Sequence, residues 1–393
     1  MIIHRIESTS KEVRVFSFNS DTGIVKPQKL DIPVSEAENY LRMNRVISDD
    51  DRVIIADKIP GAFSAPFKIY IDITDSCQLN CMHCLTKKLN LGHEISINNL
   101  EAISNECYEM GVFYIKLGGG EPLLHKDFPH ILKLFRKSGQ FISMSTNGYL
   151  VDDLVANLLY ANKVKTTVSI EGPERIDSAI RGTGHYEIAI KALNTLKRHN
   201  VNVCLRVTLT KKILDINIIK ELIQIAEAND TKIKFSYCRP AGSSIDNELL
   251  LDYSDKKRYH EVISFLNEKM NEGIAVLDEG MMIKQPQDLY MMMYDERICG
   301  CTNKSMHINS QCQFSPCVFL GTDYIFESQY VKGNIKKYWQ GLIDERVKKI
   351  RNIPFPTSCE GCDRLCKYEC LATRLYFNHN PNVSDPNCLR YMA

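Results

Sequence analysis

The central part of the chain alternates short apolar segments with longer amphipathic ones. A two-residue hydrophobic period predicts strands over 67–74, 112–118, 140–146, 164–171, 201–209 and 231–238. Between the first two, Leu100, Ile103, Cys107 and Met110 form one apolar stripe of a helix predicted over 98–110. Strands that alternate with helices form parallel sheets with crossover helices. Six such units predict an α/β fold, a partial (β/α)6 TIM-like barrel whose ligands lie at the C-terminal ends of the strands.

Several predicted strands carry a polar residue at every second position. In the fifth strand Cys204, Arg206 and Thr208 lie opposite an apolar face, and the third strand carries Ser143 and Ser145 in the same way. A barrel filled by packed side chains would leave these groups buried without partners. We therefore expect a hydrated lumen that accepts a polar ligand. The alternative, an antiparallel sheet with one face in water, agrees poorly with the intervening helices.

The barrel is expected to cover residues 67–242, with other units on either side. Residues 1–66 read as an N-terminal extension with alternating segments near 12–18 and 23–30, a helix from Ser35 and a linker-like break at 49–61. Residues 243–298 are expected to form a linker with a bridging helix over 254–272. Residues 299–393 form a small cysteine-rich region, for which an α+β fold is expected.

Composition narrows the classes of protein. The chain has 393 residues, 44% hydrophobic and 25% charged, with a net charge of +1, as in ordinary globular proteins. This balance gives no electrostatic reason to expect nucleic acid or a membrane as a partner. The N-terminus lacks the apolar core of a signal peptide, so a cytoplasmic location is expected. Fifteen cysteines in a reducing compartment favour metal binding over disulfides.

Three of these cysteines, Cys77, Cys81 and Cys84, follow directly after the first predicted barrel strand. Thiolates at such short spacing suit zinc or an iron–sulfur cluster. A [4Fe–4S] cluster held by three cysteines leaves one iron free to bind a group that is not protein. Structural zinc with a distant fourth ligand is the alternative for this motif alone.

The spacing Cys-x3-Cys-x2-Cys resembles the signature of the radical S-adenosylmethionine (SAM) enzymes. The resemblance implies that the free iron binds the amino and carboxylate groups of SAM. It also implies that an electron from the cluster releases a 5′-deoxyadenosyl radical, which takes hydrogen from a substrate. Further segments after the strands agree with this family, and the resemblance assigns SAM contacts to Gly118, Gly119, Gly120, Glu121, Asn147, Ser169, Arg181, Arg206 and Arg239.

Individual roles follow from the same resemblance. Glu121 would bind the SAM amino group, and Ser169 its carboxylate or ribose. Arg181 would bind the carboxylate or fix its loop, with Arg206 as an alternative clamp. Arg239 begins a segment expected near the adenine. Cys204 and Cys238 are candidate hydrogen-atom donors in catalysis, although buried cysteines that serve only as small apolar residues are commoner.

The last part of the chain resembles the SPASM extension of radical SAM maturases, on Ser315-Pro316-Cys317 and Gly333-Asn334-Ile335. The resemblance implies two auxiliary [4Fe–4S] clusters. The first would be bound by Cys299, Cys317 and Cys370, with Cys312 or Cys301 as a fourth ligand, and the second by Cys359, Cys362, Cys366 and Cys388. The spacing between Cys362 and Cys366 and the cysteine at 312 depart from the family pattern. Zinc ribbons are the alternative for this region.

The sequence therefore predicts a radical SAM/SPASM oxidoreductase. The favoured substrate is a ribosomally made peptide, which the enzyme would mature by crosslinking or epimerisation. The alternatives are modification of a small molecule or tetrapyrrole, and a non-catalytic zinc-scaffolded binding module. The expected partners are the substrate and a reducing electron donor such as a flavodoxin or ferredoxin. Some relatives carry a small domain that binds a leader peptide, so residues 1–66 are either such an element or a structural cap on the barrel. Their short length favours the cap.

Overall fold

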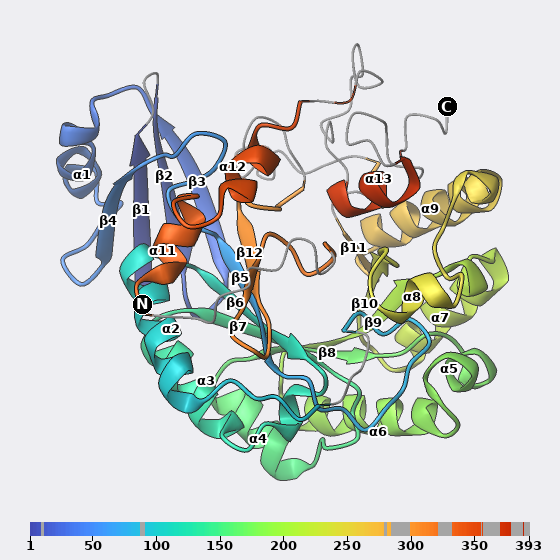
Figure 1. The fold of residues 1–393 in the computed structure, drawn as a ribbon. Helices are drawn as coiled ribbons and strands as arrows, with labels where there is room; N and C mark the ends of the chain where they lie inside the picture. The colour runs from blue at the N-terminus through green and yellow to red at the C-terminus, as the bar shows by residue number, and fades with distance from the viewer. Residues whose placement is uncertain are drawn as a thin grey trace.

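The computed structural model describes residues 1–8, 12–86, 91–278, 281–283, 299–320, 332–354, 356, 370–378 and 388. Within these ranges the chain forms a four-stranded N-terminal sheet and a nine-stranded sheet with helices along its outer side (Figure 1). Among the described helices, none combines the length and the apolar composition that a bilayer crossing requires.

The nine-stranded sheet has the order β11-β10-β9-β8-β7-β6-β5-β12-β13. Neighbouring strands are parallel except β12 and β13, which are antiparallel. The strands are β5 (Lys68–Thr74), β6 (Tyr114–Gly119), β7 (Phe141–Thr146), β8 (Lys165–Ser169), β9 (Val203–Leu209), β10 (Ile233–Tyr237), β11 (Ala275–Leu277), β12 (Ser305–Ile308) and β13 (Phe314–Ser315). Its two outermost strands do not pair with each other in the described residues, so the barrel is open. The expected α/β fold is confirmed.

The crossover helices follow the strands as predicted. The helices and 3-10 turns of the barrel are α2 (Ile97–Met110), η1 (Pro122–Leu124), α3 (Phe128–Lys137), α4 (Asp153–Ala161), α5 (Glu174–Arg181), α6 (His185–Arg198), η2 (Lys211–Ile213), α7 (Ile216–Ala228), α8 (Ser243–Asp246), η3 (Tyr253–Asp255) and α9 (Lys256–Asn271). In α2 the predicted stripe is buried, including Leu100 and Ile103. The Ser96 side chain accepts a hydrogen bond from the Asn99 N–H and caps this helix.

The two faces of the barrel strands differ as the sequence predicts. On β5, Ile69, Ile71 and Ile73 are completely buried against the helices, whereas Lys68, Tyr70 and Asp72 keep partial solvent exposure. The same alternation holds on β6, β7 and β9. The lumen is therefore lined by polar groups that keep partial solvent exposure. The expected hydration of the lumen stays a prediction.

The N-terminal sheet has the order β3-β2-β1-β4, with β1 and β4 parallel. Its elements are β1 (Ile2–Ser8), β2 (Val13–Asn19), β3 (Ile24–Leu30), α1 (Val34–Met43) and β4 (Arg52–Asp57). The sequence predicts β2, β3 and the helix but neither β1 nor β4, and it places a linker where β4 lies. The spacing of Ser35 and Glu38 predicts a capping box at the start of this helix, but α1 begins after Pro33 without a side-chain cap.

Aromatic rings join this sheet to the barrel. Phe16 of β2 contacts Phe63 and Phe67 edge to face, with ring centroids 5.5 and 5.0 Å apart. Phe18 stacks on Phe113 at 4.7 Å. Phe67 and Phe113 directly precede β5 and β6, so they mark the N-terminal ends of the strands. The small sheet thus covers the end of the barrel opposite the edge where ligands are expected.

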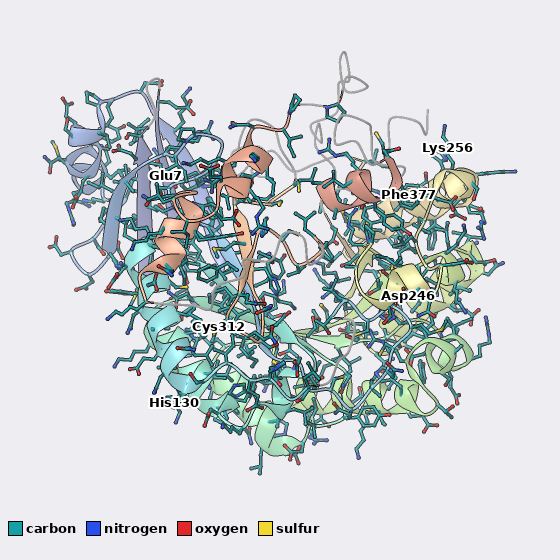
Figure 2. All side chains as sticks on the ribbon, in the orientation of Figure 1. Glu7, His130, Asp246, Lys256, Cys312 and Phe377 are labelled. Atoms are coloured by element: carbon teal, nitrogen blue, oxygen red, sulfur yellow. The ribbon has the colours of Figure 1, made fainter. Side chains whose placement is uncertain are left out.

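The C-terminal region contacts both edges of the open barrel. It contains α11 (Asn334–Trp339), α12 (Glu345–Arg351) and α13 (Leu371–Asn378). On one side β12 pairs with β5, and the N–H groups of Gly333 and Ile335 donate to the Glu106 carboxylate of α2. On the other side Phe377 of α13 packs against a cluster that contains Cys238 and Leu250 (Figure 2). The domain boundaries given above stay predictions.

A buried ion pair lies in the centre of the N-terminal sheet. Arg5 and Glu7 of β1 are 0% and 1% exposed, and Arg5 Nε lies 2.9 Å from Glu7 Oε1. The Arg5 guanidinium also lies over the rings of Phe67 (4.4 Å) and Phe113 (4.8 Å). Burial lowers the pKa of Arg5, and the Glu7 charge opposes this shift. These charged side chains explain why β1 carries no clear hydrophobic period.

We expect Glu7→Gln to destabilise the protein by about 3 kcal/mol, because it leaves the Arg5 charge buried without a counterion. The thermal unfolding midpoint, which should fall by several degrees, measures the effect. Glu36→Gln, at an exposed position of α1, is the control and should leave the midpoint unchanged. Equal midpoints for the two variants would contradict this account.

Candidate active site

The three cysteines of the predicted signature lie on the loop that follows β5. The Leu79 N–H donates to Cys77 Sγ (3.5 Å), and the Cys84 N–H donates to the Cys81 carbonyl (3.1 Å). The loop is anchored from outside by the Met82 N–H, which donates to the Ile180 carbonyl at the end of α5. Burial raises the pKa of Cys81; the Arg181 charge opposes this, whereas the neighbouring thiols Cys84 and Cys77 add to it. Cys81 is therefore close enough to interact with both Cys77 and Cys84.

The glycine segment at the end of β6 fastens this loop. Gly119 has a φ of 107°, and a Cβ atom there would lie 2.0 Å from the Thr74 carbonyl oxygen. A Cβ on Gly120 would lie 2.0 Å from the Ser76 carbonyl oxygen. The N–H groups of Gly120 and Glu121 donate to these same two carbonyls, each at 2.8 Å. The two glycines therefore let the backbone of the cysteine loop approach closely, and the SAM contacts assigned to them stay predictions.

Glu121 is buried beside the loop that follows β7. Its carboxylate accepts hydrogen bonds from Thr146 Oγ1 (2.9 Å) and from the Asn147 N–H (2.8 Å). Burial nevertheless raises the pKa of Glu121 to about 7. Asn147 continues toward the cysteines, because its side-chain Nδ2 lies 3.8 Å from Cys77 Sγ. A nearby cation would lower the pKa of Glu121, so this carboxyl is suited to bind an ammonium group.

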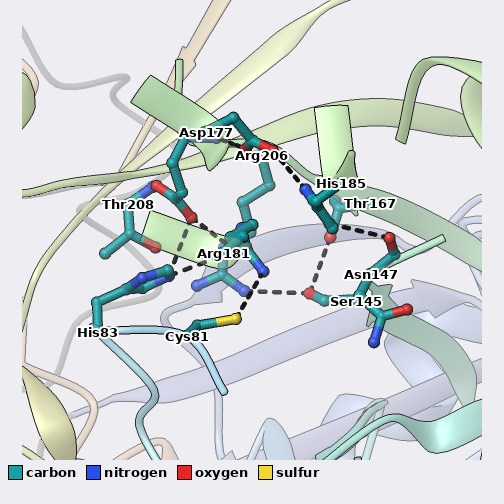
Figure 3. A network of polar contacts seen from close by, with 11 residues as sticks. Cys81, His83, Ser145, Asn147, Thr167, Asp177, Arg181, His185, Arg206 and Thr208 are labelled. Atoms are coloured by element: carbon teal, nitrogen blue, oxygen red, sulfur yellow. Dashed lines mark hydrogen bonds and ion pairs between the residues drawn. The ribbon is translucent and has the colours of Figure 1, made fainter. Parts of the chain in front are cut away.

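Glu171, two residues after the end of β8, connects three elements through one buried carboxylate. Its partners His83, Arg181 and Thr208 are labelled in Figure 3. Glu171 accepts hydrogen bonds from Arg181 Nη2 (2.6 Å) and from the Thr208 N–H (2.9 Å), and it lies 3.0 Å from His83 Nε2. Burial alone would raise the pKa of Glu171, but His83 and Arg181 outweigh it and lower the pKa to about 2. Arg181 Nη1 in turn lies 3.7 Å from Cys81 Sγ. Glu171 therefore stays ionised and holds a cation against the cysteine loop.

A second buried pair supports this network from α5 and α6. Asp177 Oδ1 accepts from the Glu171 N–H (2.8 Å), and Asp177 Oδ2 lies 2.6 Å from His185 Nδ1. The other ring nitrogen of His185 lies 3.1 Å from the Asn147 carbonyl oxygen. The loops after β7 and β8 are thereby joined, and they fix the positions of Asn147 and Glu171.

The sequence did not assign a role to His83, Glu171 or His185. His83 lies inside the cysteine motif, between Cys81 and Cys84, and Glu171 lies in a segment already noted at the end of the fourth strand. Their positions were therefore visible in the sequence. Their partners were not, because Arg181 and Thr208 reach Glu171 only through the fold.

The remaining expected site residues lie at different depths. Gly118 and Ser169 line the lumen near the strand ends, at partly exposed positions. Arg206 points deeper, and its Nη1 donates to Ser145 Oγ (3.1 Å). Arg239 reaches toward the C-terminal region, where its Nη1 donates to Thr373 Oγ1 (3.3 Å). The SAM-binding roles given to these residues stay predictions.

The two candidate hydrogen donors also differ. Cys204 faces the lumen near several cationic side chains, although burial raises its pKa. Cys238 is buried in a cluster with Leu249 and Leu250, and burial raises its pKa to about 12. Cys204 has the better access to the lumen, and neither role is tested by the structure.

A second group of thiols forms in the C-terminal region. Cys299 and Cys301 share a hydrogen bond, and Cys317 and Cys370 lie near enough to raise the pKa of Cys301. The bond from Cys301 lowers the pKa of Cys299, which favours its thiolate form. Cys312 lies elsewhere, beside α2, where its sulfur accepts from Asn99 Nδ2 (3.5 Å; Figure 2). This geometry favours Cys301 over Cys312 as the fourth ligand. Cys359, Cys362 and Cys366 lie outside the described residues.

The thiol groups and the donors around them suit iron–sulfur clusters. In the described ranges, no three His, Cys, Asp or Glu side chains converge as tightly as one metal ion requires. A cubane cluster keeps its thiolates further apart than one ion does. The N–H groups and the Arg181 guanidinium around Cys77 and Cys81 are the donors that cluster thiolates accept. The first loop also offers three thiols, which leaves one iron of a cubane for another ligand.

An open parallel barrel with a three-thiol loop at the C-terminal strand ends defines an iron–sulfur enzyme class. Residues 71–224 match the family model for the radical SAM superfamily, so this stretch is a radical SAM domain. This domain indicates an enzyme that uses SAM and an iron–sulfur cluster.

Longer similarities extend beyond that domain. The chain is 23% identical to the mycofactocin maturase MftC of Mycobacterium tuberculosis over 345 residues, 86% of each chain. It is 28% identical to the Fe-coproporphyrin III synthase of Methanosarcina barkeri over 158 residues, 39% of this chain and 40% of that one. Its fold is similar to that of Streptococcus suis SuiB bound to the precursor peptide SuiA, with a TM-score of 0.73 and 15% identity over 98% of this chain and 97% of that one.

We expect Glu171→Gln to weaken the cysteine loop, because a neutral amide cannot balance the buried charge of Arg181. Breaking such a pair costs about 3–5 kcal/mol. The reconstituted variant should unfold at a lower temperature and lose its visible cluster absorption faster in the presence of an iron chelator. Glu174→Gln, exposed at the start of α5, should behave like the unchanged protein. Chelation at equal rates in both variants would refute the role given to Glu171.

The raised pKa of Glu121 predicts a pH effect in protein without SAM. Glu121 holds its proton up to about pH 7 when folded but loses it near 4.5 when unfolded. Its contribution to stability must therefore fall as pH rises through this window, by on the order of 3 kcal/mol. The difference in unfolding free energy between the wild type and Glu121→Gln, measured from pH 5 to 8, reports this contribution. Parallel curves for the two proteins would show that the pKa is unshifted.

Proposed function

We propose that this radical SAM enzyme modifies a ribosomally made peptide, by forming a crosslink or by epimerisation. The observation that carries the proposal is the cysteine loop itself, with three thiols, the Glu171–Arg181 pair beneath them and Glu121 beside them. A peptide substrate is supported by the similarity to the maturase MftC over 86% of the chain. It is also supported by the likeness to SuiB, which was solved with a precursor peptide.

Each group at the strand ends has a proposed role. Cys77, Cys81 and Cys84 would hold the [4Fe–4S] cluster, which supplies the single electron that cleaves SAM. Glu121 would bind the SAM ammonium, and Ser169 lies at the matching strand end for its carboxylate or ribose. Because Glu171 already occupies one edge of the Arg181 guanidinium, we assign Arg181 to positioning the cysteine loop. Arg239 stays a candidate for the adenine side.

We further propose auxiliary clusters in the C-terminal region. Cys299, Cys301, Cys317 and Cys370 would hold the first one, supported by their mutual contacts. The second would take Cys359, Cys362, Cys366 and Cys388, on the family resemblance alone. A reducing partner such as a flavodoxin or ferredoxin would supply electrons. Fifteen cysteines support a reducing, cytoplasmic location.

Modification of a small molecule or tetrapyrrole is the second candidate function. It is supported by the similarity to Fe-coproporphyrin III synthase, which spans 39% of this chain. The peptide proposal has the wider support, because its relatives match both the barrel and the C-terminal region.

The test of the peptide proposal is co-expression with the short open reading frames next to the gene. Mass spectrometry of one encoded peptide should show a changed mass, such as a loss of two hydrogens for a crosslink, or a changed stereocentre after hydrolysis. The change should vanish when Cys77, Cys81 and Cys84 are all replaced by Ala. Unmodified peptides together with turnover of a tetrapyrrole by the same enzyme would contradict the peptide proposal.

The auxiliary ligands can be tested by counting iron. Anaerobic reconstitution should give about twelve irons per chain, four for each of three cubanes. We expect Cys301→Ala to lose up to about four of them, because it removes one ligand of the first auxiliary cluster. Cys312→Ala is the matched control and should keep the full number. The opposite result would return the fourth position to Cys312.

A further inference from the structure

Two cationic side chains converge on one neutral hydroxyl group inside the barrel. Lys116 lies on β6 and Arg206 on β9, at inward-facing positions. Lys116 Nζ donates to Ser145 Oγ (2.8 Å), and Arg206 Nη1 donates to the same oxygen (3.1 Å). Ser145 Oγ also lies 2.8 Å from Thr167 Oγ1 (Figure 3). Two like charges are thus held around a single small polar group.

Neither cation has a carboxylate partner among the residues that the structure describes. Two acids of the same barrel have closer partners: Asp278 lies 3.1 Å from Lys234, although Arg206 is near enough to help lower the pKa of Asp278, and Asp72 lies 2.9 Å from His307. Arg206 Nε is buried and has no hydrogen-bond acceptor. The site therefore has donors to spare and an excess of positive charge.

Positive charge at these partly buried positions without a close counterion is unfavourable, and the lowered pKa of Lys116 agrees with this. Its pKa lies well below the ordinary value, mainly because of burial and further because of the charges of Arg206, Lys234 and Lys68. An anion placed between Lys116 and Arg206 would remove this penalty. A carboxylate suits the geometry, because its two oxygens can accept from the ammonium and the guanidinium while Ser145 turns to donate.

The position of this site separates it from the SAM-binding strand ends. Lys116 precedes Gly119 by three residues on β6, which corresponds to about 10 Å of strand. Ser145 precedes Asn147 by two residues, about 7 Å, and it is Asn147 that lies beside Cys77. The site thus lies deeper in the lumen than the thiols that would hold the cluster and the SAM chelate.

We propose that Lys116 and Arg206, together with Ser145 and Thr167, form a subsite in the lumen that binds one carboxylate of the peptide substrate. The inference rests on the proposed function, since it assigns the anion to a peptide. The carboxylate comes either from the C-terminus of the peptide or from an acidic side chain, and both present the same two oxygens. Arg206 then serves the substrate rather than the SAM carboxylate.

Calorimetric titration of the SAM-loaded, unreduced enzyme tests the subsite without turnover. The probes are acetyl-Gly-Tyr-Gly with a free C-terminus, its C-terminal amide, the amide acetyl-Gly-Asp-Gly-NH2, and inorganic phosphate, all at one ionic strength. We expect at least one carboxylate probe to bind about tenfold or more tightly than the neutral amide. The better of the two carboxylate probes identifies the source of the carboxylate. Equal affinities for charged and neutral peptides, or binding of phosphate alone, would overturn the proposal.

Single substitutions test whether the carboxylate probes bind at this subsite. Lys116→Met and Arg206→Met should each remove the preference for the carboxylate probe, whereas Lys133→Met, exposed on α3, should keep it. Cluster absorption and the unfolding midpoint establish that each variant is folded and loaded. SAM affinity, measured in the same variants, should not change. If it falls with the probe affinity, the two cations serve SAM and the proposal is wrong.

The outcome of these binding experiments can be distinguished from the outcome of the test of the peptide proposal. If co-expressed peptides stay unmodified while the carboxylate preference depends on Lys116 and Arg206, the subsite stands and its natural ligand is a small carboxylate. If a peptide is modified equally by the wild type and by both Met variants, the subsite is wrong and the peptide function stands.

Discussion

The arrangement of the active site depends on one buried carboxylate. Glu171 holds Arg181 from α5, His83 from the cysteine loop and the N–H of Thr208 at the end of β9. His83 and Arg181 outweigh the effect of burial on the pKa of Glu171, so the carboxylate remains charged. Because Arg181 also reaches Cys81, the position of a thiol is set by an ion pair inside the protein. The loop can then present three thiols without a fourth protein ligand to hold it in place.

The other parts of the fold are arranged around the active site at the C-terminal ends of the strands. The N-terminal sheet covers the opposite end through Phe16, Phe18 and their partners, so the lumen is closed there by aromatic packing. The C-terminal region contacts β5 on one side and the end of β10 on the other. Between the N-terminal sheet and the C-terminal region, the inner face of the barrel remains polar and partly exposed. Such a lumen can keep a reactive group near a bound substrate and away from the outer solvent.

Much of this arrangement could be predicted from the sequence. The six strands β5 to β10 follow from their two-residue period, and the cysteine motif lies at the strand end where parallel barrels bind ligands. The short strands β11, β12 and β13, which extend the same sheet, were not predicted. The strand β1 could not be predicted, because its Arg5 and Glu7 are buried by pairing with each other rather than exposed. Nor could the partners of Glu171, because residues 83, 181 and 208 meet only after folding. The choice between Cys301 and Cys312 depends likewise on which thiol the fold turns toward Cys299.

The central claim is that the cluster on Cys77, Cys81 and Cys84 has one iron that the protein does not ligate. Electron paramagnetic resonance of the dithionite-reduced protein, recorded before and after SAM is added, tests this most directly. The claim predicts that the g values of one reduced cluster shift when SAM binds, and that this signal is absent when the three cysteines are replaced by Ala. A spectrum that SAM leaves unchanged would contradict it.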